Sequence, residues 1–197
     1  MRPISTMPVR SSPSRYNTGM RRTLQLHPES SCFAVTHIDV EVLRPQARNF
    51  TFTYVVTGTI SDLAIPPVAA GTRTDELWRH TCFEAFVGSP QSVAYYEFNF
   101  APSTQWAAYR FSNYRTDLCV ATEINAPQIT VRSNPERYVV QASVELGQVL
   151  FSRCLTLRVG LSAVIEETSG RRSYWALAHP PGKADFHHSD SFALEVV

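Results

Sequence analysis

The sequence predicts an all-β protein, an antiparallel β-sandwich or jelly roll, and three observations support that prediction. Apolar and polar residues alternate with a period of two, turn residues separate the alternating segments at short intervals, and no long stretch repeats its apolar residues at the helical period. The chain has 197 residues, a length that suits one domain with a core of its own.

The alternation is clearest in three segments, at 50–57, 138–146 and 155–165. Strands that bury one face and expose the other are typical of antiparallel sheets. Further strands are predicted at 33–42, 81–87, 94–100, 105–111, 128–132, 172–178 and 191–196. Short helical turns are predicted at 73–78 and 147–152. Many short strands at this spacing indicate two packed sheets.

The first 22 residues differ in composition from the rest of the chain. They contain five arginines and three prolines but no acidic residue, so they predict a disordered basic tail, and residues 23–197 form the predicted domain. An organelle transit peptide, or a true start at Met20, are alternative interpretations of this segment. We expect a cytoplasmic location, with the periplasm as the alternative, because no secretory signal is visible and the four cysteines show no pairing pattern.

Charge and hydropathy exclude two classes of partner. The net charge is +1, and the 13 basic and 17 acidic residues after the tail make the domain mildly acidic. This balance argues against a nucleic-acid-binding protein that relies on bulk electrostatics. No run approaches the roughly 18 apolar residues of a membrane helix, so we predict no membrane span.

Two glutamates lie in the middle of neighbouring predicted strands, among aromatic residues. A hairpin around 88–93 that keeps like faces together places Glu84 opposite or diagonal to Glu97. Two like charges so placed are destabilising unless something neutralises them. Arg110 on the next strand is the predicted partner, and a cation or a polyhydroxyl ligand is the alternative.

This neighbourhood has three interpretations. A buried Glu–Arg network would only set the strand register. A polar site walled by Trp78, Trp106 and tyrosines would suit a sugar, whose C–H faces pack on rings and whose hydroxyls need charged or amide partners. A glycosidase would also use two carboxylates, but a carboxylate pair held by arginine on a sandwich is more often structural.

Three motifs resemble those of the DOMON-like proteins, which belong with the family-nine carbohydrate-binding modules in one β-sandwich superfamily. They are Leu77-Trp78 followed by Glu84-Ala85-Phe86, then YEFNFAP at 96–102 with Trp106 and Tyr109 after it, and the closing segment YWALAHPPGKADFHH at 174–188. Together these motifs are specific to the subfamily, and the resemblance covers residues 24–197.

The resemblance implies a jelly roll that binds small ligands and has no catalysis of its own. Family-nine modules hold sugar chain ends between two tryptophans, with a carboxylate and arginines on the hydroxyls, and carry structural calcium. Trp78 and Glu84 keep the Trp-then-Glu spacing of that site, so the resemblance makes Trp175 the second wall and Arg110 the arginine. The predicted ligand-binding residues are therefore Trp78, Glu84, Glu97, Asn99, Arg110 and Trp175.

Two other functions stay open as alternatives to a sugar-binding module that is not an enzyme. Haem-binding DOMON branches ligate iron through Met with His or Lys, and the three methionines here lie within the first 20 residues, which argues against haem but leaves a bis-His site open. A structural or interaction domain would pair Glu84 fully with Arg110 and leave no cleft beside Trp78.

The C-terminal segment gathers residues that could bind a metal: His179, Asp185, His187, His188 and Asp190. Their spacing matches no standard zinc site, and no dense acidic loop is present for calcium. We expect instead a turn-rich loop in which His187 is hydrogen-bonded to a neighbouring strand.

Overall fold

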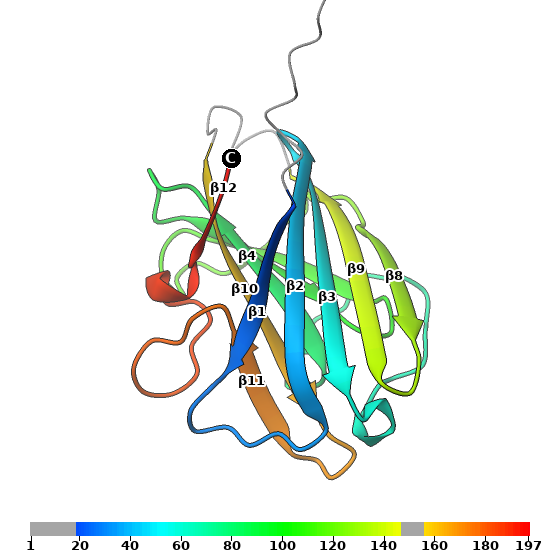
Figure 1. Ribbon diagram of the computed structural model, residues 1–197. Coiled ribbons are helices and arrows are strands. Elements are labelled where there is room, and N and C mark those ends of the chain that lie inside the picture. The colour runs from blue at the N-terminus through cyan, green and yellow to red at the C-terminus, as the bar shows by residue number, and fades with distance from the viewer. Residues whose placement is uncertain (1–18, 147–155) are drawn as a thin grey trace, which may run out of the picture.

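A computed structural model describes residues 19–146 and 156–197, which form two layers of antiparallel strands (Figure 1). The strands are β1 (Met20–Leu26), β2 (Val35–Gln46), β3 (Asn49–Gly58), β4 (Cys82–Gly88), β5 (Tyr95–Phe100), β6 (Trp106–Phe111), β7 (Cys119–Val120), β8 (Gln128–Ser133), β9 (Arg137–Glu145), β10 (Leu157–Glu166), β11 (Arg172–Ala176) and β12 (Leu194–Val196). Three short 3-10 helices are η1 (Ile60–Asp62), η2 (Leu77–Arg79) and η3 (Ser189–Ser191). The all-β antiparallel sandwich is confirmed, and the finer assignment to a jelly roll stays a prediction.

The strand order is β7-β6-β5-β4-β10-β11-β1-β2-β3-β9-β8, with β12 also paired to β10. In Figure 1 the strands β1, β2, β3, β9 and β8 form the front layer, and β4 and β10 pass behind it. Strand β1 joins the layers, because Met20–Leu24 pairs with β2 whereas Gln25 and Leu26 pair with β11. The sheet therefore curls at β1 and folds onto itself.

The main core lies between the two layers. Strands β3 and β9 alternate buried and partly exposed residues, as their sequence pattern predicts. The ring of Tyr54 on β3 lies 5.1 Å from that of Phe83 on β4, and the ring of Phe52 lies 6.1 Å from that of Phe100 on β5. Aromatic contacts at these distances add to the burial of apolar surface that holds the layers together.

The other face of the back layer is covered as well. A second apolar cluster lies there: Phe86, Tyr95, Ala107, Tyr109, Phe111 and Phe192. The segment between β11 and β12, drawn orange to red in Figure 1, supplies Phe192 and η3 to this cover. Every residue of β4 and β5 is buried, so polar residues on their second face are removed from water.

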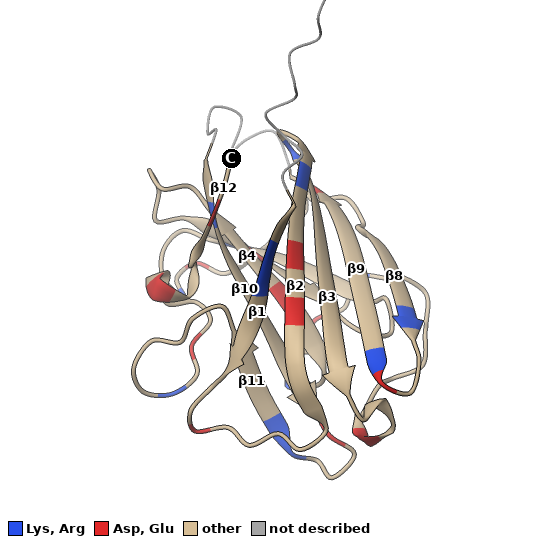
Figure 2. Cartoon of the chain, in the orientation of Figure 1, with Lys and Arg blue, Asp and Glu red and all other residues tan. Residues whose placement is uncertain are grey.

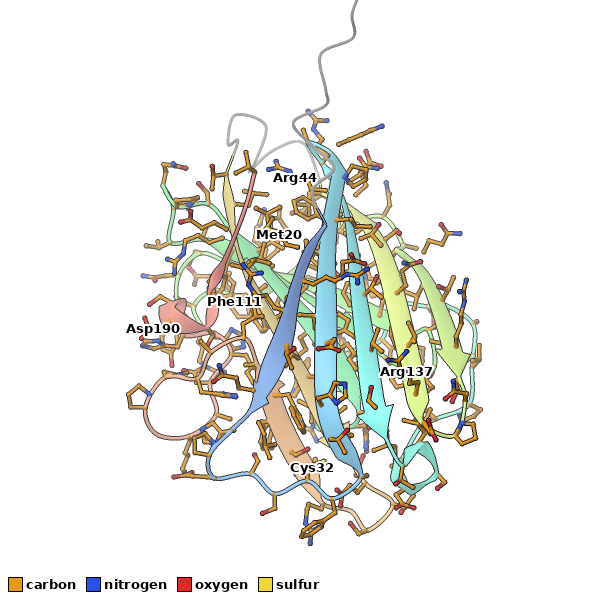
Figure 3. All side chains as sticks on the ribbon, viewed as in Figure 1. Met20, Cys32, Arg44, Phe111, Arg137 and Asp190 are labelled. Carbon is orange, nitrogen blue, oxygen red and sulfur yellow. The ribbon has the colours of Figure 1, made fainter. Side chains whose placement is uncertain are left out.

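The outer face of the front layer carries paired charges. Basic residues on β1 lie beside acidic residues on β2 (Figure 2), and Arg21 Nε donates to Glu41 Oε1 at 2.9 Å. Arg44, labelled in Figure 3, lies near the C-terminal end of β2 and, unlike these exposed charged residues, is buried. Its guanidinium donates to the carbonyl of Ala47 at 2.8 Å.

The predicted strands at 33–42, 50–57 and 81–87 correspond to β2, β3 and β4, with boundaries that shift by a few residues. Residues 20–22 belong to β1, which corrects the predicted tail boundary at residue 22, whereas residues 1–18 lie outside the described residues. The predicted turn at 73–78 is displaced to η2, and that at 147–152 also lies outside the described residues. No helix in the described part of the chain is long and apolar enough to cross a membrane.

Candidate functional site

A pocket of about 480 Å³ opens on the outer face of the back layer, away from the main core. Its floor comes from β4, β5 and β10, and its walls come from η2, β6, β11 and two loops. The lining residues are Trp78, Arg79, Glu84, Glu97, Tyr109, Phe111, Arg115, Leu118, Val164, Arg172, Tyr174, Ala184, Phe186 and His187. Aromatic walls with few polar groups at the floor are typical of small-ligand sites.

The two glutamates meet at the floor of this pocket. Glu84 lies opposite Asn99, and Glu97 lies opposite Phe86, so the glutamates are diagonal neighbours on one face of the sheet, as predicted. Glu84 Oε2 accepts from the Ser162 hydroxyl at 3.1 Å, and the Asn99 amide donates to Glu97 Oε1 at 2.7 Å. Both glutamates are at most 5% exposed.

Burial disfavours the charged form of both carboxyl groups. It raises the pKa of Glu84 to about 8, and the neighbouring Glu97 adds to that rise. Burial also raises the pKa of Glu97 to about 6, although the Asn99 amide and the Arg115 guanidinium oppose the change. Two buried acids so close together hold a proton at neutral pH more readily than exposed acids do.

His187 closes one side of the pocket. Tyr95 Oη accepts from the Arg115 backbone N–H at 3.2 Å and forms a hydrogen bond with His187 Nδ1 at 2.8 Å. The other ring nitrogen, Nε2, lies 3.6 Å from Glu97 Oε2. Burial, with Arg115 nearby, lowers the pKa of His187 to about 4. The ring is therefore neutral at pH 7, and its predicted hydrogen bond to a neighbouring strand is confirmed.

Three arginines surround the mouth of the pocket. Arg115 has a left-handed backbone (φ 51°), and its guanidinium donates to Asp185 Oδ1 at 2.8 Å. Arg79 pairs with Glu76 at 2.7 Å, and Arg172 donates to the Arg79 carbonyl at 3.3 Å. These contacts hold the guanidinium groups above the floor and leave further N–H donors for a ligand.

Trp78 is the aromatic side chain of the pocket that a ligand meets first. It belongs to η2, is 37% exposed, and its ring packs edge-on against Tyr109 at 5.9 Å. Tyr109 is itself fixed, since its hydroxyl donates to Asp75 Oδ1 at 2.7 Å. A partly exposed indole that is supported by a second ring can offer apolar surface to a ligand.

The prediction that Arg110 neutralises the glutamates is wrong. Glu97 lies opposite Tyr109, whereas Arg110 lies opposite Tyr96. The Arg110 side chain therefore extends from the face of the sheet opposite to that of the glutamates. There it is 47% exposed and lies 3.7 Å from Glu123. Glu84 and Arg110 thus do not form the ion pair that a purely structural domain would be expected to have. An open pocket lies beside Trp78 instead.

We expect the substitution Arg110→Ala to change neither the melting temperature nor ligand affinity by more than an exposed surface substitution does. Its ion pair with Glu123 is solvent-exposed, and such pairs contribute little. Thermal unfolding and a ligand titration check this. A fall in affinity like that caused by a pocket substitution would return Arg110 to the site.

Trp175 lies elsewhere than predicted, and Asn99 does not line the pocket. Trp175 lies opposite Ala163 in the main core, is 4% exposed, and its indole N–H donates to Ser173 Oγ at 3.0 Å. It therefore does not form the second wall, which its neighbour Tyr174 supplies together with Phe186. Asn99 lies opposite Glu84 on the same face of the sheet as the two glutamates, but it is fully buried and outside the pocket lining, and its amide orients Glu97.

Several lining residues were missed by sequence reasoning. The alternation that places Glu97 in the pocket also places Tyr109 there, and the same rule selects Tyr174 over Trp175. No periodic signal marks Arg115 or Phe186, because both lie in irregular segments whose course depends on tertiary packing.

The described residues do not supply the metal site that the resemblance implies. Among residues 19–146 and 156–197, no three His, Cys, Asp or Glu side chains lie together in a group that could hold a metal ion. A calcium site built from three or more carboxylates is therefore absent from those residues. Met20 packs against the main core, so it does not offer its sulfur to a haem in the pocket.

Comparison with known proteins identifies relatives of this fold. The chain is structurally similar to a candidate carbohydrate-binding protein from Bacteroides uniformis ATCC 8492. The TM-score is 0.52 at 12% identity, over 76% of this chain and 74% of that chain. This similarity shows a shared fold. No protein-family model and no curated protein matches the chain.

Two further matches are to carbohydrate binding module family 9 proteins from Caldicellulosiruptor kristjanssonii. The protein solved with cellotriose gives a TM-score of 0.44 at 12% identity, over 81% of this chain and 74% of that chain. The protein solved with glucose gives a TM-score of 0.47 at 13% identity, over 87% of this chain and 82% of that chain.

Proposed function

We propose that this protein is a small-ligand-binding module without catalysis, and that its ligand is a carbohydrate or a related polyhydroxyl compound. The observation that carries the proposal is the pocket itself, in which an exposed indole faces a floor of two buried carboxyl groups. Trp78 offers a stacking surface, while Glu84 and Glu97 offer hydrogen-bond acceptors.

The chemistry of the lining matches that of a sugar. A pyranose has an apolar C–H face, which packs on an aromatic ring, and hydroxyl groups that both donate and accept hydrogen bonds. The carboxyl oxygens accept at the floor, and the N–H groups of Arg172 and Arg115 donate near the mouth. The shared fold of the candidate carbohydrate-binding protein from Bacteroides uniformis supports this assignment without identifying the sugar.

The test is a calorimetric titration with neutral mono- and oligosaccharides, glucose and cellotriose included, on wild type and Trp78→Ala. We expect saturable binding in wild type and an affinity loss of about tenfold or more in the variant, because the stacking surface is removed. The melting temperature should barely change, since Trp78 lies at the surface.

Phe33→Ala is the matched control, since Phe33 is 77% exposed and lies outside the pocket. Its affinity should equal that of wild type. Absence of binding at millimolar sugar, or binding that Trp78→Ala leaves intact, would refute the proposal.

A further inference from the structure

We infer that the preferred ligand carries a positively charged amine, as a primary amino sugar does, and that Glu84 and Glu97 bind its ammonium group at the floor of the pocket. The inference rests on the proposed function, because it assigns the chemical class of the sugar that this same pocket takes.

The first support is that no Lys or Arg in the part of the chain that the structure describes forms an ion pair with Glu84 or Glu97, although the Arg115 guanidinium is near enough to oppose the rise of both pKa values. The contacts of Glu84 are a hydroxyl from Ser162, and those of Glu97 are the Asn99 amide and the neutral His187 ring. Glu84 Oε1 has no hydrogen-bond partner among those residues, although Glu84 is 3% exposed and lines the pocket. A buried carboxylate is normally paired with a cation, so this floor is complementary to a positive group.

The arginines of the pocket do not meet that need, because other groups hold them. Arg115 is bound by Asp185, and Arg79 is bound by Glu76. Arg172 donates to a backbone carbonyl, and no ion pair joins any of the three to Glu84 or Glu97 within the described residues. The negative floor favours a bound orientation in which the cationic end of the ligand lies deepest, and Asp185 and Glu76 offset part of the positive charge of Arg115 and Arg79.

The walls supply the second support. Trp78, Tyr109 and Tyr174 line the pocket with Phe111 and Phe186, and aromatic faces attract cations. A primary ammonium has three N–H donors, enough for Glu84 Oε1, for Glu97 Oε2 and for a third acceptor. A neutral hydroxyl at the same point has a single donor and leaves the negative charge uncompensated.

Binding of an ammonium group should also release a proton from the pocket. The charged or titratable groups around the glutamates come from five parts of the fold: Cys82 on β4, Arg79 on η2, Tyr109 on β6, Arg172 and Tyr174 on β11, and Arg115 and His187 from the loops. The pKa of Glu84 lies near 8 in the free protein, so this carboxyl holds its proton at pH 7. An incoming ammonium stabilises the carboxylate, and the proton of Glu84 leaves to the buffer.

Calorimetric titration of the full chain at pH 7 with glucosamine, glucose and N-acetylglucosamine tests the inference. N-acetylglucosamine keeps a nitrogen at the same carbon but has no charge. We expect glucosamine to bind about tenfold more tightly than either neutral sugar. The observed enthalpy should differ between phosphate and Tris buffers for glucosamine alone, because a proton is released.

Two variants complete the design. Glu84→Gln should abolish both the preference for glucosamine and the proton release, and Glu145→Gln, an exposed substitution on β9 outside the pocket, should keep both. Equal binding of glucose and glucosamine, or a preference that survives in Glu84→Gln, would overturn this inference and leave the proposed function standing. Absence of binding by these three sugars and by cellotriose would overturn both.

Discussion

Glu84→Gln is expected to raise the free energy of unfolding of the ligand-free protein at pH 8 by about 1–3 kcal/mol. The substitution keeps the shape of the side chain and its hydrogen bond from Ser162, but it removes a carboxyl group that is 3% exposed and lies beside a second one. Chemical denaturation of both proteins measures the difference. Glu145→Gln is the control and should lie within the error of wild type.

The sign of the pH dependence follows from the same group. The pKa of Glu84 is raised to about 8, so folding retains a proton that the unfolded chain releases near pH 4.5, and the stability from this group is lost as pH rises toward 8. The stability contributed by the raised pKa of Glu97 is likewise lost as the pH rises, up to about pH 6. His187, with a pKa near 4 in the folded state, acts in the opposite sense between about pH 4 and 6.5.

Above pH 6.5 the contribution of Glu84 is therefore isolated. We expect the stability of wild type to fall between pH 6.5 and 8 by up to about 1.4 kcal/mol per pH unit, and the slope to flatten in Glu84→Gln. Equal slopes in the two proteins, or a variant less stable than wild type at pH 8, would show that Glu84 is ionised in the fold at no cost.

Trp175→Ala is expected to destabilise the protein by about 3–5 kcal/mol, which is the range for removing a large buried aromatic side chain. Trp175 packs in the main core and its indole N–H is bonded to Ser173, whereas Trp78 lies at the surface of the pocket. Trp175→Phe should cost less, because most of the volume stays filled.

Denaturation curves and sugar titrations on the two tryptophan variants separate these roles. Trp175→Ala should lose stability, and Trp78→Ala should lose affinity. A Trp175→Ala protein of normal stability that no longer binds sugar would place Trp175 at the ligand after all.

The fold could be predicted from the sequence because its signal is local. Alternation over 50–57 and 138–146 reports strands with one buried face, and the structure has β3 and β9 there. The diagonal placement of Glu84 and Glu97 was also predictable, since a short hairpin connects β4 to β5 and leaves few registers.

The remainder of the site depends on information that no short pattern holds. A shift of one residue moves a side chain to the opposite face of a sheet, which is why Arg110 and Trp175 were assigned to the pocket in place of Tyr109 and Tyr174. Arg115 reaches the pocket from an irregular loop, so its position follows from tertiary contacts such as its pair with Asp185.

The buried carboxyl groups have a stability cost, which the hydrogen bonds from Ser162 and Asn99 reduce and which the proposed ligand would reduce further. An apolar pair at the positions of Glu84 and Glu97 would suit the fold better, because β4 and β5 are buried on both faces. Sites that lower stability in this way are typical of binding and catalytic centres, where function requires groups that packing alone would not favour.

The most direct test of this account is the response of the three indole N–H signals in a ¹H–¹⁵N spectrum during titration with sugar. Trp106 and Trp175 donate their indole N–H groups to Gly71 and Ser173 inside the protein, whereas Trp78 lines the pocket. We predict that the Trp78 signal shifts progressively and saturates while the other two stay in place. A shift confined to Trp106 or Trp175, or no shift under conditions where calorimetry detects binding, would place the ligand outside this pocket.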